Sequence, residues 1–305
     1  MPTSQPPSNP PVLARAARLA GPLRSLRGWT RVVDAVCPMA GGDRYAFDVP
    51  FFGLRYRGTL GSFIDRQVYF SGAYEKDELA FVRQWWGQRA GSRGGGIAID
   101  VGANVGHHTL AFSRIFGAVH AFEPNPGPLV RLRQSLADNQ ISNVTVYPLG
   151  LWDRDAELPF NTPPASNTGM GSFKDDVDSL GATGPQTLPV RAGDPLLQAA
   201  GIERIDCLKI DVQGAEHEVL VGLKQTLARS RPLIWIEISP STRKDLPTLA
   251  ALTAVVGGGR FQALTFTRSQ PWLNGVSATL VDDAAYTNLD GNLLLVPHPE
   301  NTSSS

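Results

Sequence analysis

The sequence predicts an α/β fold built on a doubly wound, mostly parallel sheet, and two patterns lead to this prediction. Short segments that are almost entirely apolar recur along the chain, among them IAIDV at 97–101 and LIWIEI at 233–238. Segments with helical periodicity separate them, and glycine-containing turns lead from strand to helix. Strands that are apolar on both faces and alternate with helices are typical of a parallel sheet covered on both sides by right-handed crossovers.

Composition is that of an ordinary soluble globular protein of one large or two small domains. The chain has 305 residues, of which 42% are hydrophobic, and only two cysteines. A chain of this length buries roughly 75% of the surface that its unfolded form exposes, so it needs no disulfide or metal to fold. Cys37 and Cys207 lie too far apart for a CxxC redox pair or a zinc knuckle. This usage fits a reducing compartment, and we expect a cytoplasmic protein.

Charge and hydropathy exclude further classes. The 28 basic and 28 acidic side chains cancel, so nucleic acid is not an expected partner. No run reaches the roughly 18 apolar residues that a transmembrane helix needs. Residues 13–33 hold five arginines and no acid. We interpret them as a helix packed on the domain; peripheral membrane contact or an organelle-targeting role is the alternative.

The chain divides into an N-terminal extension and a core domain. Prolines among polar residues predict a disordered tail at the start. Alternating apolar residues punctuated by glycines predict a hairpin or small sheet over 44–72, and a change of period predicts a helix over 74–88. The predicted parts are a disordered tail at 1–12, an N-terminal helix and small β extension at 13–95, the core domain at 96–299 and a disordered tail at 300–305.

Strands and helices alternate within the core domain. We expect strands at 97–101, 118–122, 143–149, 205–210 and 233–238, and helices from about 106, at 127–138 and at 214–227. Two more strands, at 261–266 and 292–297, have no convincing helix between them. We expect them to close the sheet as an antiparallel pair.

One segment, residues 161–189, does not follow this alternation. Asn, Thr, Gly, Pro and Ser dominate it, and Met170 and Phe173 are its main apolar anchors. Loops this long in a compact domain are usually functional or disordered. Its place between two strands of the sheet makes it a candidate substrate loop that covers the site.

The strongest chemical signal is the turn after the first core strand. Residues 100–106 read DVGANVG and lead into a helix, and Glu123 ends the next predicted strand, 21 residues after Gly102. In a doubly wound sheet this turn needs glycine so that its backbone can approach a ligand. An acid about 20 residues later accepts hydrogen bonds from ribose hydroxyls. The spacing therefore predicts a ligand of the adenosine type.

Departures from the dinucleotide pattern indicate which ligand this is. A pyrophosphate fingerprint would require glycine where the chain has Asn104 and His107. Asp100 adds a carboxylate at the turn, which would repel a diphosphate and attract a cation. S-adenosylmethionine carries a sulfonium and an ammonium group and no phosphate, so it suits this site better than NAD or ATP. An NAD-dependent dehydrogenase is the weaker alternative.

At these residues the chain resembles the FkbM family of S-adenosylmethionine-dependent methyltransferases. The resemblance spans about residues 70–240 and is specific, well beyond a lone glycine motif. It rests on four segments in the family's order, namely DVGANVG (100–106), FEPNP (122–126), LKIDVQGAEHEVLVG (208–222) and PLIWIEIS (232–239).

The resemblance implies a fold, a methyl donor and a class of acceptor. The fold is a Rossmann-like sheet of seven strands of the class I methyltransferase type. The donor is S-adenosylmethionine, and the acceptor is usually a hydroxyl group of a saccharide or of another natural product. The glycine turn would hold the methionine part of the donor, and the end of the next strand its ribose. The corresponding positions are Asp100, Gly102, Ala103, Asn104 and Gly106 in the turn, and Glu123 with Pro124 after the strand.

Two positions depart from the family pattern. Gln213 stands where the family usually has a glutamate, so any base or metal ligand at that position is absent here. The strand at 143–149 runs into Gly150 without the acid that many methyltransferases direct at the adenine amino group. Leu149 and Leu151 would instead supply apolar walls of the cofactor site.

Candidate catalytic residues gather at the carboxyl ends of two later strands. Methyl transfer to a hydroxyl needs an aligned acceptor oxygen and usually a base that removes its proton. Lys209 and Asp211 share one face at the end of a strand, where ligands of such sheets bind. We expect Asp211 to be the base and Lys209 to tune it; a structural ion pair is the alternative. Glu216 and Glu237, near the same edge, complete the candidate catalytic set.

A metal is not part of the predicted site. Glu216, His217 and Glu237 together are candidate ligands for a divalent ion, but no ligand spacing favours one. The favoured function is O-methylation of a saccharide or secondary metabolite. N-methylation of a small molecule and a catalytically inactive scaffold that binds the cofactor are the alternatives. The sequence predicts neither the identity of the acceptor nor the oligomeric state.

Overall fold

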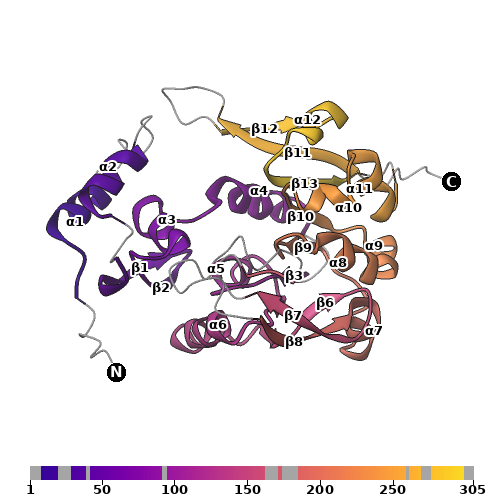
Figure 1. Ribbon diagram of the computed structural model, residues 1–305, viewed down its shortest axis with the longest axis horizontal. Helices are drawn as coiled ribbons and strands as arrows, with labels where there is room; N and C mark the ends of the chain where they lie inside the picture. The colour runs from indigo at the N-terminus through magenta and orange to yellow at the C-terminus, as the bar shows by residue number, and fades with distance from the viewer. Residues whose placement is uncertain are drawn as a thin grey trace.

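The computed structural model of the chain has a central sheet of eight strands (Figure 1). It describes residues 8–19, 29–38, 42–90, 95–161, 171–173, 185–258, 261–268 and 276–298. The strand order is β12-β11-β13-β10-β9-β3-β4-β5. The strands are β3 (Ile97–Val101), β4 (Ala118–Phe122), β5 (Val144–Tyr147), β9 (Cys207–Ile210), β10 (Leu233–Ile238), β11 (Phe261–Arg268), β12 (Val276–Leu280) and β13 (Gly291–Pro297).

The first strands of the sheet run parallel and the C-terminal ones antiparallel. β5, β4, β3, β9 and β10 are parallel to one another. β13 pairs antiparallel with both β10 and β11, and β12 pairs antiparallel with β11 at the edge. The predicted mostly parallel sheet and its closing antiparallel pair are confirmed. The predicted number of seven strands is wrong, because β12 adds an eighth at the edge.

Two apolar layers cover the sheet, one on each face. Along β10, Leu233 and Trp235 belong to one layer, and Ile234 and Ile236 to the other, as the alternation of side chains along a strand requires. The helices that cover the first layer are α4 (Lys76–Gly87), α5 (His107–Phe112) and α6 (Pro126–Asp138). The second is covered by α7 (Gly193–Ala199), α8 (Glu216–Gly222), α9 (Lys224–Ser230) and α11 (Leu249–Val255). The sheet is therefore doubly wound, as predicted.

Two helix predictions in the C-terminal half need correction. The single helix predicted over 214–227 is two helices, α8 and α9, because Asp194 accepts hydrogen bonds from two backbone N–H groups of α9 and caps a new helix there. Between β11 and β13 lies a helix, α12 (Asp283–Thr287), that the sequence did not predict; Asp282 caps it. A further short helix, α10 (Thr242–Asp245), follows β10.

A second, three-stranded sheet occupies part of the segment for which one long loop was predicted. β6 (Gly150–Trp152) runs parallel to β8 (Pro185–Ala192), and β7 (Ala156–Asn161) runs antiparallel to it. The loop predicted at 161–189 is therefore shorter, because 185–189 belong to β8. Within the described residues 171–173, Ser172 pairs with Asn161. The rest of the candidate substrate loop, including Met170, lies outside the described residues.

Within the N-terminal extension, the elements before α4 pack beside α4 itself and beside α5 and α6 of the core domain (Figure 1). The hairpin of the extension is confirmed, and α4 matches the helix predicted over 74–88. The prediction of strand structure over the whole of 44–72 is wrong, because Ser62 caps a helix that covers Phe63–Ser71. The elements are α1 (Val12–Leu19), α2 (Trp29–Val36), the 3₁₀-helix η2 (Gly42–Arg44), β1 (Ala46–Phe51), β2 (Leu54–Thr59) and α3 (Phe63–Ser71).

The arginine-rich stretch and the predicted tails are described only in part. α1 and α2 lie at the two ends of the arginine-rich stretch, and residues 20–28 between them lie outside the described residues. The predicted tail at 1–12 is described from Ser8, whose backbone pairs with Tyr45; the one at 300–305 is not described. Among the described helices, none is long and apolar enough to cross a membrane.

A buried polar group joins the hairpin to α6, and we call Tyr56, Asp65 and Arg131 the hairpin cluster. Asp65 is fully buried. It accepts hydrogen bonds from the Tyr56 hydroxyl at 2.8 Å, the Thr59 N–H at 2.9 Å and Arg131 Nη2 at 3.0 Å. A buried carboxylate satisfied in this way is stable only while all its donors stay in place, so the cluster fixes the extension on the core domain.

Candidate cofactor and acceptor site

The turn between β3 and α5 lies close against the end of β9. Gly102 and Gly106 have φ angles of 80° and 88°, in the left-handed region that favours glycine. A Cβ on Gly102 would lie 1.8 Å from the carbonyl oxygen of Asp211, so no larger residue fits there. The N–H of Gly102 also donates to the Phe122 carbonyl at 3.0 Å. Gly102 is thus required by the close approach of the ends of β3, β4 and β9, whereas a Cβ on Gly106 would lie 2.4 Å from Leu132 of α6.

Glu123 follows β4 and directs its carboxylate toward this turn. Its oxygens accept hydrogen bonds from the backbone N–H groups of Asn104 at 2.8 Å and Asn125 at 2.7 Å. Burial raises the pKa of Glu123 to about 7, and the two backbone hydrogen bonds oppose this rise. A cation or a pair of hydroxyl donors beside it would favour the ionised carboxylate.

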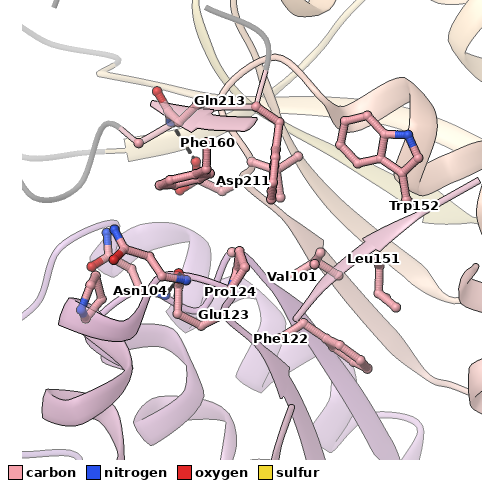
Figure 2. Close-up of a pocket in the computed structure, with 17 residues that line it drawn as sticks. Val101, Asn104, Phe122, Glu123, Pro124, Leu151, Trp152, Phe160, Asp211 and Gln213 are labelled. Atoms are coloured by element: carbon pink, nitrogen blue, oxygen red, sulfur yellow. Dashed lines mark hydrogen bonds between the residues drawn. The ribbon is translucent and has the colours of Figure 1, made fainter. Parts of the chain in front are cut away.

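A pocket lies between this turn and the ends of β6, β7 and β9 (Figure 2); its empty space, including the part that is open to solvent, is about 620 Å³. Figure 2 shows Glu123 and Asp211 on opposite walls, and no Lys, Arg or His occurs among the described lining residues. The lining residues are Val101, Gly102, Asn104, Phe122, Glu123, Pro124, Asn125, Pro128, Gly150, Leu151, Trp152, Phe160, Gly171, Phe173, Asp211, Val212 and Gln213.

Half of the residues predicted to bind the cofactor line this cavity. Those that do are Gly102, Asn104, Glu123 and Pro124. Those that do not, within the described lining, are Asp100, Ala103, Gly106 and Leu149. Ala103 and Gly106 shape the turn from behind, and Leu151 supplies the apolar wall predicted for both leucines.

Aromatic residues close one side of the cavity, and the sequence reasoning missed this wall. Phe173 packs edge-on against Trp152 and Phe160, with ring centroids 5.6 and 4.9 Å away. Phe160 lies on β7 and Trp152 on β6, two strands that the sequence did not predict. Phe173 had been recognised only as an anchor of the long loop. The available signal was the recurrence of aromatic residues just before the polar loop and within it.

Asp100 lies behind the cavity wall rather than at its mouth. The side chain is fully buried, and the Thr109 hydroxyl donates to Oδ2 at 2.6 Å. Oδ1 has no hydrogen-bond partner among the described residues, and the Lys209 ammonium lies 3.8 Å from it. Burial raises the pKa of Asp100, while Lys209 opposes the rise. This carboxylate therefore faces Lys209 instead of a ligand in the cavity.

Polar side chains meet at the carboxyl ends of β3, β9 and β10, and we call Asp100, Lys209, Asp211, Gln213 and Glu237 the strand-end cluster. The Lys209 ammonium lies 3.4 Å from Asp211 Oδ2. The Gln213 amide donates to Asp211 Oδ1 at 2.8 Å and to Glu237 Oε2 at 2.7 Å. The structure thus brings three of the four predicted catalytic residues together. Gln213, noted from the sequence only as a departure, connects two of them.

The electrostatics of this cluster separate its acids. Burial raises the pKa of Glu237 to about 9, and the charge of Asp211 and a hydrogen bond to Asp211 add to this rise. Burial alone would lower the pKa of Lys209, but the surrounding carboxylates, Asp211 first, raise it above its usual value. At neutral pH the cluster therefore holds a charged lysine and a protonated Glu237.

Glu216, the fourth predicted catalytic residue, stands apart from the cavity. It is fully buried. It accepts hydrogen bonds from the N–H groups of Val212 at 3.2 Å and Gly214 at 3.1 Å, and from the Thr242 hydroxyl at 2.9 Å. These contacts hold the turn after β9. In the part of the chain that the structure describes, no group of three His, Cys, Asp or Glu side chains is arranged to hold a metal ion.

Comparison with known proteins identifies relatives for the core of the chain. The family model described as "Methyltransferase FkbM domain" matches residues 100–255, more than half of the sequence. The 2-O-methyltransferase NoeI of Sinorhizobium fredii is 27% identical over 158 residues, which cover 47% of this chain and 63% of that protein. The hexuronic acid methyltransferase AglP of Haloferax volcanii is 30% identical over 139 residues, covering 46% of this chain and 54% of that protein.

Two further comparisons extend this set. The 31-O-demethyl-FK506 methyltransferase FkbM of Streptomyces tacrolimicus is 29% identical over 160 residues, covering 43% of this chain and 61% of that protein. The chain thus spans between half and two thirds of the length of these relatives. A crystal structure of methyltransferase FkbM from Methylobacillus flagellatus aligns with a TM-score of 0.43 and 18% identity over 66% of this chain and 43% of that one.

Proposed function

Because the chain belongs to the FkbM family of methyltransferases, we propose that it transfers a methyl group from S-adenosylmethionine to a hydroxyl group of a saccharide or secondary metabolite. The observation that carries this proposal is the cavity at the ends of β3, β4 and β9. Glu123 and Asp211 face it, and no basic residue occurs in its described lining. Such a site favours a cation and disfavours a diphosphate.

The residues of the cavity fit S-adenosylmethionine. Glu123 is held by two backbone N–H groups with lone pairs left over for ribose hydroxyls. The apolar side chains of Leu151, Phe160 and Phe173 offer surface for an adenine ring. When bound, S-adenosylmethionine supplies a methyl group activated by a positively charged sulfur. The carboxylate of Asp211 is the negative group on the opposite wall.

Asp211 is the base of the proposed reaction. It lines the cavity, its side chain is 29% exposed, and it lies beside the positively charged Lys209. A carboxylate at the boundary between the cavity and solvent can accept the proton of an acceptor hydroxyl as the oxygen attacks. The ammonium of Lys209 would then stabilise negative charge that develops on this oxygen.

The choice of a hydroxyl acceptor rests on the relatives. Two of the three named above are O-methyltransferases by name, and a third acts on hexuronic acid by name. The proposal includes the division of the chain into an extension at 13–95, a methyltransferase domain at 96–299 and tails at either end. The hairpin cluster fixes the extension beside the core, and none of the described residues that line the cavity belongs to the extension.

Calorimetric titration of the full chain with S-adenosylmethionine tests the donor, with NAD and ATP as controls. We expect selective binding of S-adenosylmethionine. Glu123→Gln should weaken it, whereas Glu203→Gln, the same change at an exposed position, should not. Preference for NAD, or no binding at all, would contradict the proposal.

A second experiment tests methyl transfer itself. Methyl-labelled S-adenosylmethionine is incubated with the protein and panels of neutral sugars, amino sugars and hydroxylated metabolites, and the label is located by mass spectrometry. We expect label on a hydroxyl oxygen. Label on nitrogen would show N-methylation, and binding of the donor without transfer to any acceptor would favour a scaffold.

A further inference from the structure

The side chain of Gln213 occupies a central position in the strand-end cluster. Its backbone φ is 54°, in the left-handed region, and this conformation turns the side chain back toward the end of β10. The two amide hydrogens are both used, one on Asp211 and one on Glu237, at 2.8 and 2.7 Å. A single neutral group thus joins carboxyl groups that lie 26 residues apart in the sequence.

The backbone of Gln213 is held by the segment that closes the cavity. Ser172 donates its hydroxyl to the Gln213 carbonyl at 2.7 Å, and Ser172 itself pairs with Asn161 at the end of β7. Both Gln213 and Asp211 line the cavity. The residue therefore links three parts of the site: the covering segment, the cavity wall and the end of β10.

The positions of protons in the strand-end cluster explain why an amide side chain is suited to position 213. Glu237 is hydrogen-bonded to Asp211, and this contact favours the protonated form of Glu237. The Gln213 amide donates to Glu237 Oε2 and to Asp211 Oδ1, and the Lys209 ammonium lies 3.4 Å from the other oxygen of Asp211. Besides Asp100 and Lys209 within the cluster, other titratable groups face it, namely Tyr74 and Glu75 ahead of α4, His107 and His108 from α5 and Glu216 from α8.

This inference rests on the proposed methyl transfer. We propose that Gln213 is a positioning residue, whose amide holds Asp211 and Glu237 together as one pair and presents the Asp211 carboxylate to the acceptor hydroxyl. In the reaction the acceptor oxygen forms a bond to the methyl carbon with its lone pair. The carbon–sulfur bond breaks, and its electrons stay on sulfur as a neutral thioether. The hydroxyl proton moves to Asp211 and then leaves to solvent, which restores the pair.

A carboxylate at position 213 would disturb this arrangement. Gln213→Glu removes both N–H donors and adds a third acid within hydrogen-bond distance of two others. Like charges so close together raise the pH at which each proton is lost. We expect the acidic limb of the pH–kcat profile to move up by about one unit, so that kcat is about tenfold lower at a pH that lies below the midpoint of this limb in both proteins.

Gln134→Glu is the matched control. Gln134 is exposed on α6 and donates to Asp138 Oδ1 at 2.7 Å, so the substitution makes the same chemical change beside a carboxylate away from the site. Carboxyl signals of Asp211 and Glu237 are followed by ¹³C NMR on the full chain and assigned with Asp211→Asn and Glu237→Gln. Titration midpoints of both signals that move upward in Gln213→Glu and not in Gln134→Glu support the pair. Midpoints that stay in place overturn it.

A second variant, Gln213→Asn, keeps the inference testable if Gln213→Glu does not fold. Gln213→Asn keeps the amide, and asparagine tolerates the left-handed backbone, but its side chain is one methylene too short to reach both acids. We expect about tenfold lower kcat on the acceptor found by the screen, with donor affinity changed less than about threefold. Full kcat at every pH would overturn the inference. If the unaltered protein fails to bind S-adenosylmethionine, the proposed function falls, while the NMR titration still tests the pair.

Discussion

The hairpin cluster and the strand-end cluster are both built on a buried aspartate, yet they are satisfied to different degrees. Asp65 accepts hydrogen bonds from a hydroxyl, a backbone N–H and a guanidinium. Asp100 is equally buried but leaves Oδ1 without a hydrogen bond and faces Lys209 at 3.8 Å. The first cluster has no exposed acid, whereas the second continues to Asp211 at the cavity.

This difference indicates which of the two clusters takes part in the proposed reaction. Completely paired buried groups rigidify a fold, because every change leaves a donor or an acceptor unpaired. Clusters of acids that remain partly unpaired beside a cavity are typical of functional sites, since their pKa values are displaced from one another. In the strand-end cluster burial raises the pKa of Glu237 to about 9, while Asp211 keeps access to the cavity. Substitutions in the two clusters should therefore affect different properties.

The largest effect should come from Asp211→Asn. We expect methyl transfer to fall by about 10²–10⁴-fold, the usual contribution of a general base, because the amide cannot take the acceptor proton. The midpoint of urea unfolding should change less than in Asp65→Ala, since Asp211 is partly exposed and Asp100 stays beside the buried Lys209. Initial rates with labelled donor and a denaturation curve provide the two measurements. Asp290→Asn, at an exposed position, is the control, and full activity in Asp211→Asn would require a different base.

Asp65→Ala should lower the stability of the protein and leave its binding of the donor nearly unchanged. Loss of Asp65 leaves the Tyr56 hydroxyl and the Thr59 N–H unpaired and the charge of Arg131 uncompensated, so we expect the free energy of unfolding to fall by about 3 kcal/mol. Urea denaturation measures this change. Calorimetry on the folded variant should give a donor affinity within about twofold of the original, because among the described residues the hairpin cluster makes no hydrogen bond to a residue that lines the cavity. A large loss of donor affinity with unchanged stability would reverse the assignment of the two clusters.

Much of this fold was predictable from local pattern. The apolar segments at 97–101, 118–122 and 233–238 match β3, β4 and β10 to the residue, because buried parallel strands are short, apolar on both faces and bounded by turns. β7 and β8 escaped prediction since they contain Pro159, Pro185 and Pro189, which argue against strands. The start of α9 depends on a cap from Asp194, about thirty residues earlier, which apolar periodicity does not report.

The site was predictable where it depends on spacing and not where it depends on side-chain direction. Glu123 was placed by its distance from Gly102, and both line the cavity. Asp100 occupies the predicted strand end, but its side chain faces Lys209, a partner that only the pairing of β3 with β9 brings close. The hydrogen bond between Gln213 and Glu237 likewise joins two strand ends, and no local pattern in the sequence contains it.

A smaller effect concerns the pH dependence of donor binding. Burial raises the pKa of Glu123 to about 7, and a cationic ligand with ribose hydroxyls binds the ionised form better. Protons therefore compete with the donor as pH falls through 7. We expect the affinity for S-adenosylmethionine to be about tenfold lower at pH 6 than at pH 8, as measured by calorimetry. In Glu123→Gln this part of the pH dependence should disappear, and an identical slope in both proteins would assign it to another group.

The smallest effect should come from an exposed ion pair between the same elements that the hairpin cluster joins. Arg57 on β2 contacts Asp138 at the end of α6, and its side chain is 53% exposed. Water and salt screen such a pair, and ordering two long side chains offsets the attraction. Arg57→Ala should therefore leave the urea midpoint unchanged within the error of the measurement, at low and at high salt. Arg131→Ala, which removes a hydrogen-bond partner of the buried Asp65 across the same interface, should lower it clearly. Equal losses in both variants would mean that charge between β2 and α6, rather than the complete pairing of a buried carboxylate, holds the extension on the core.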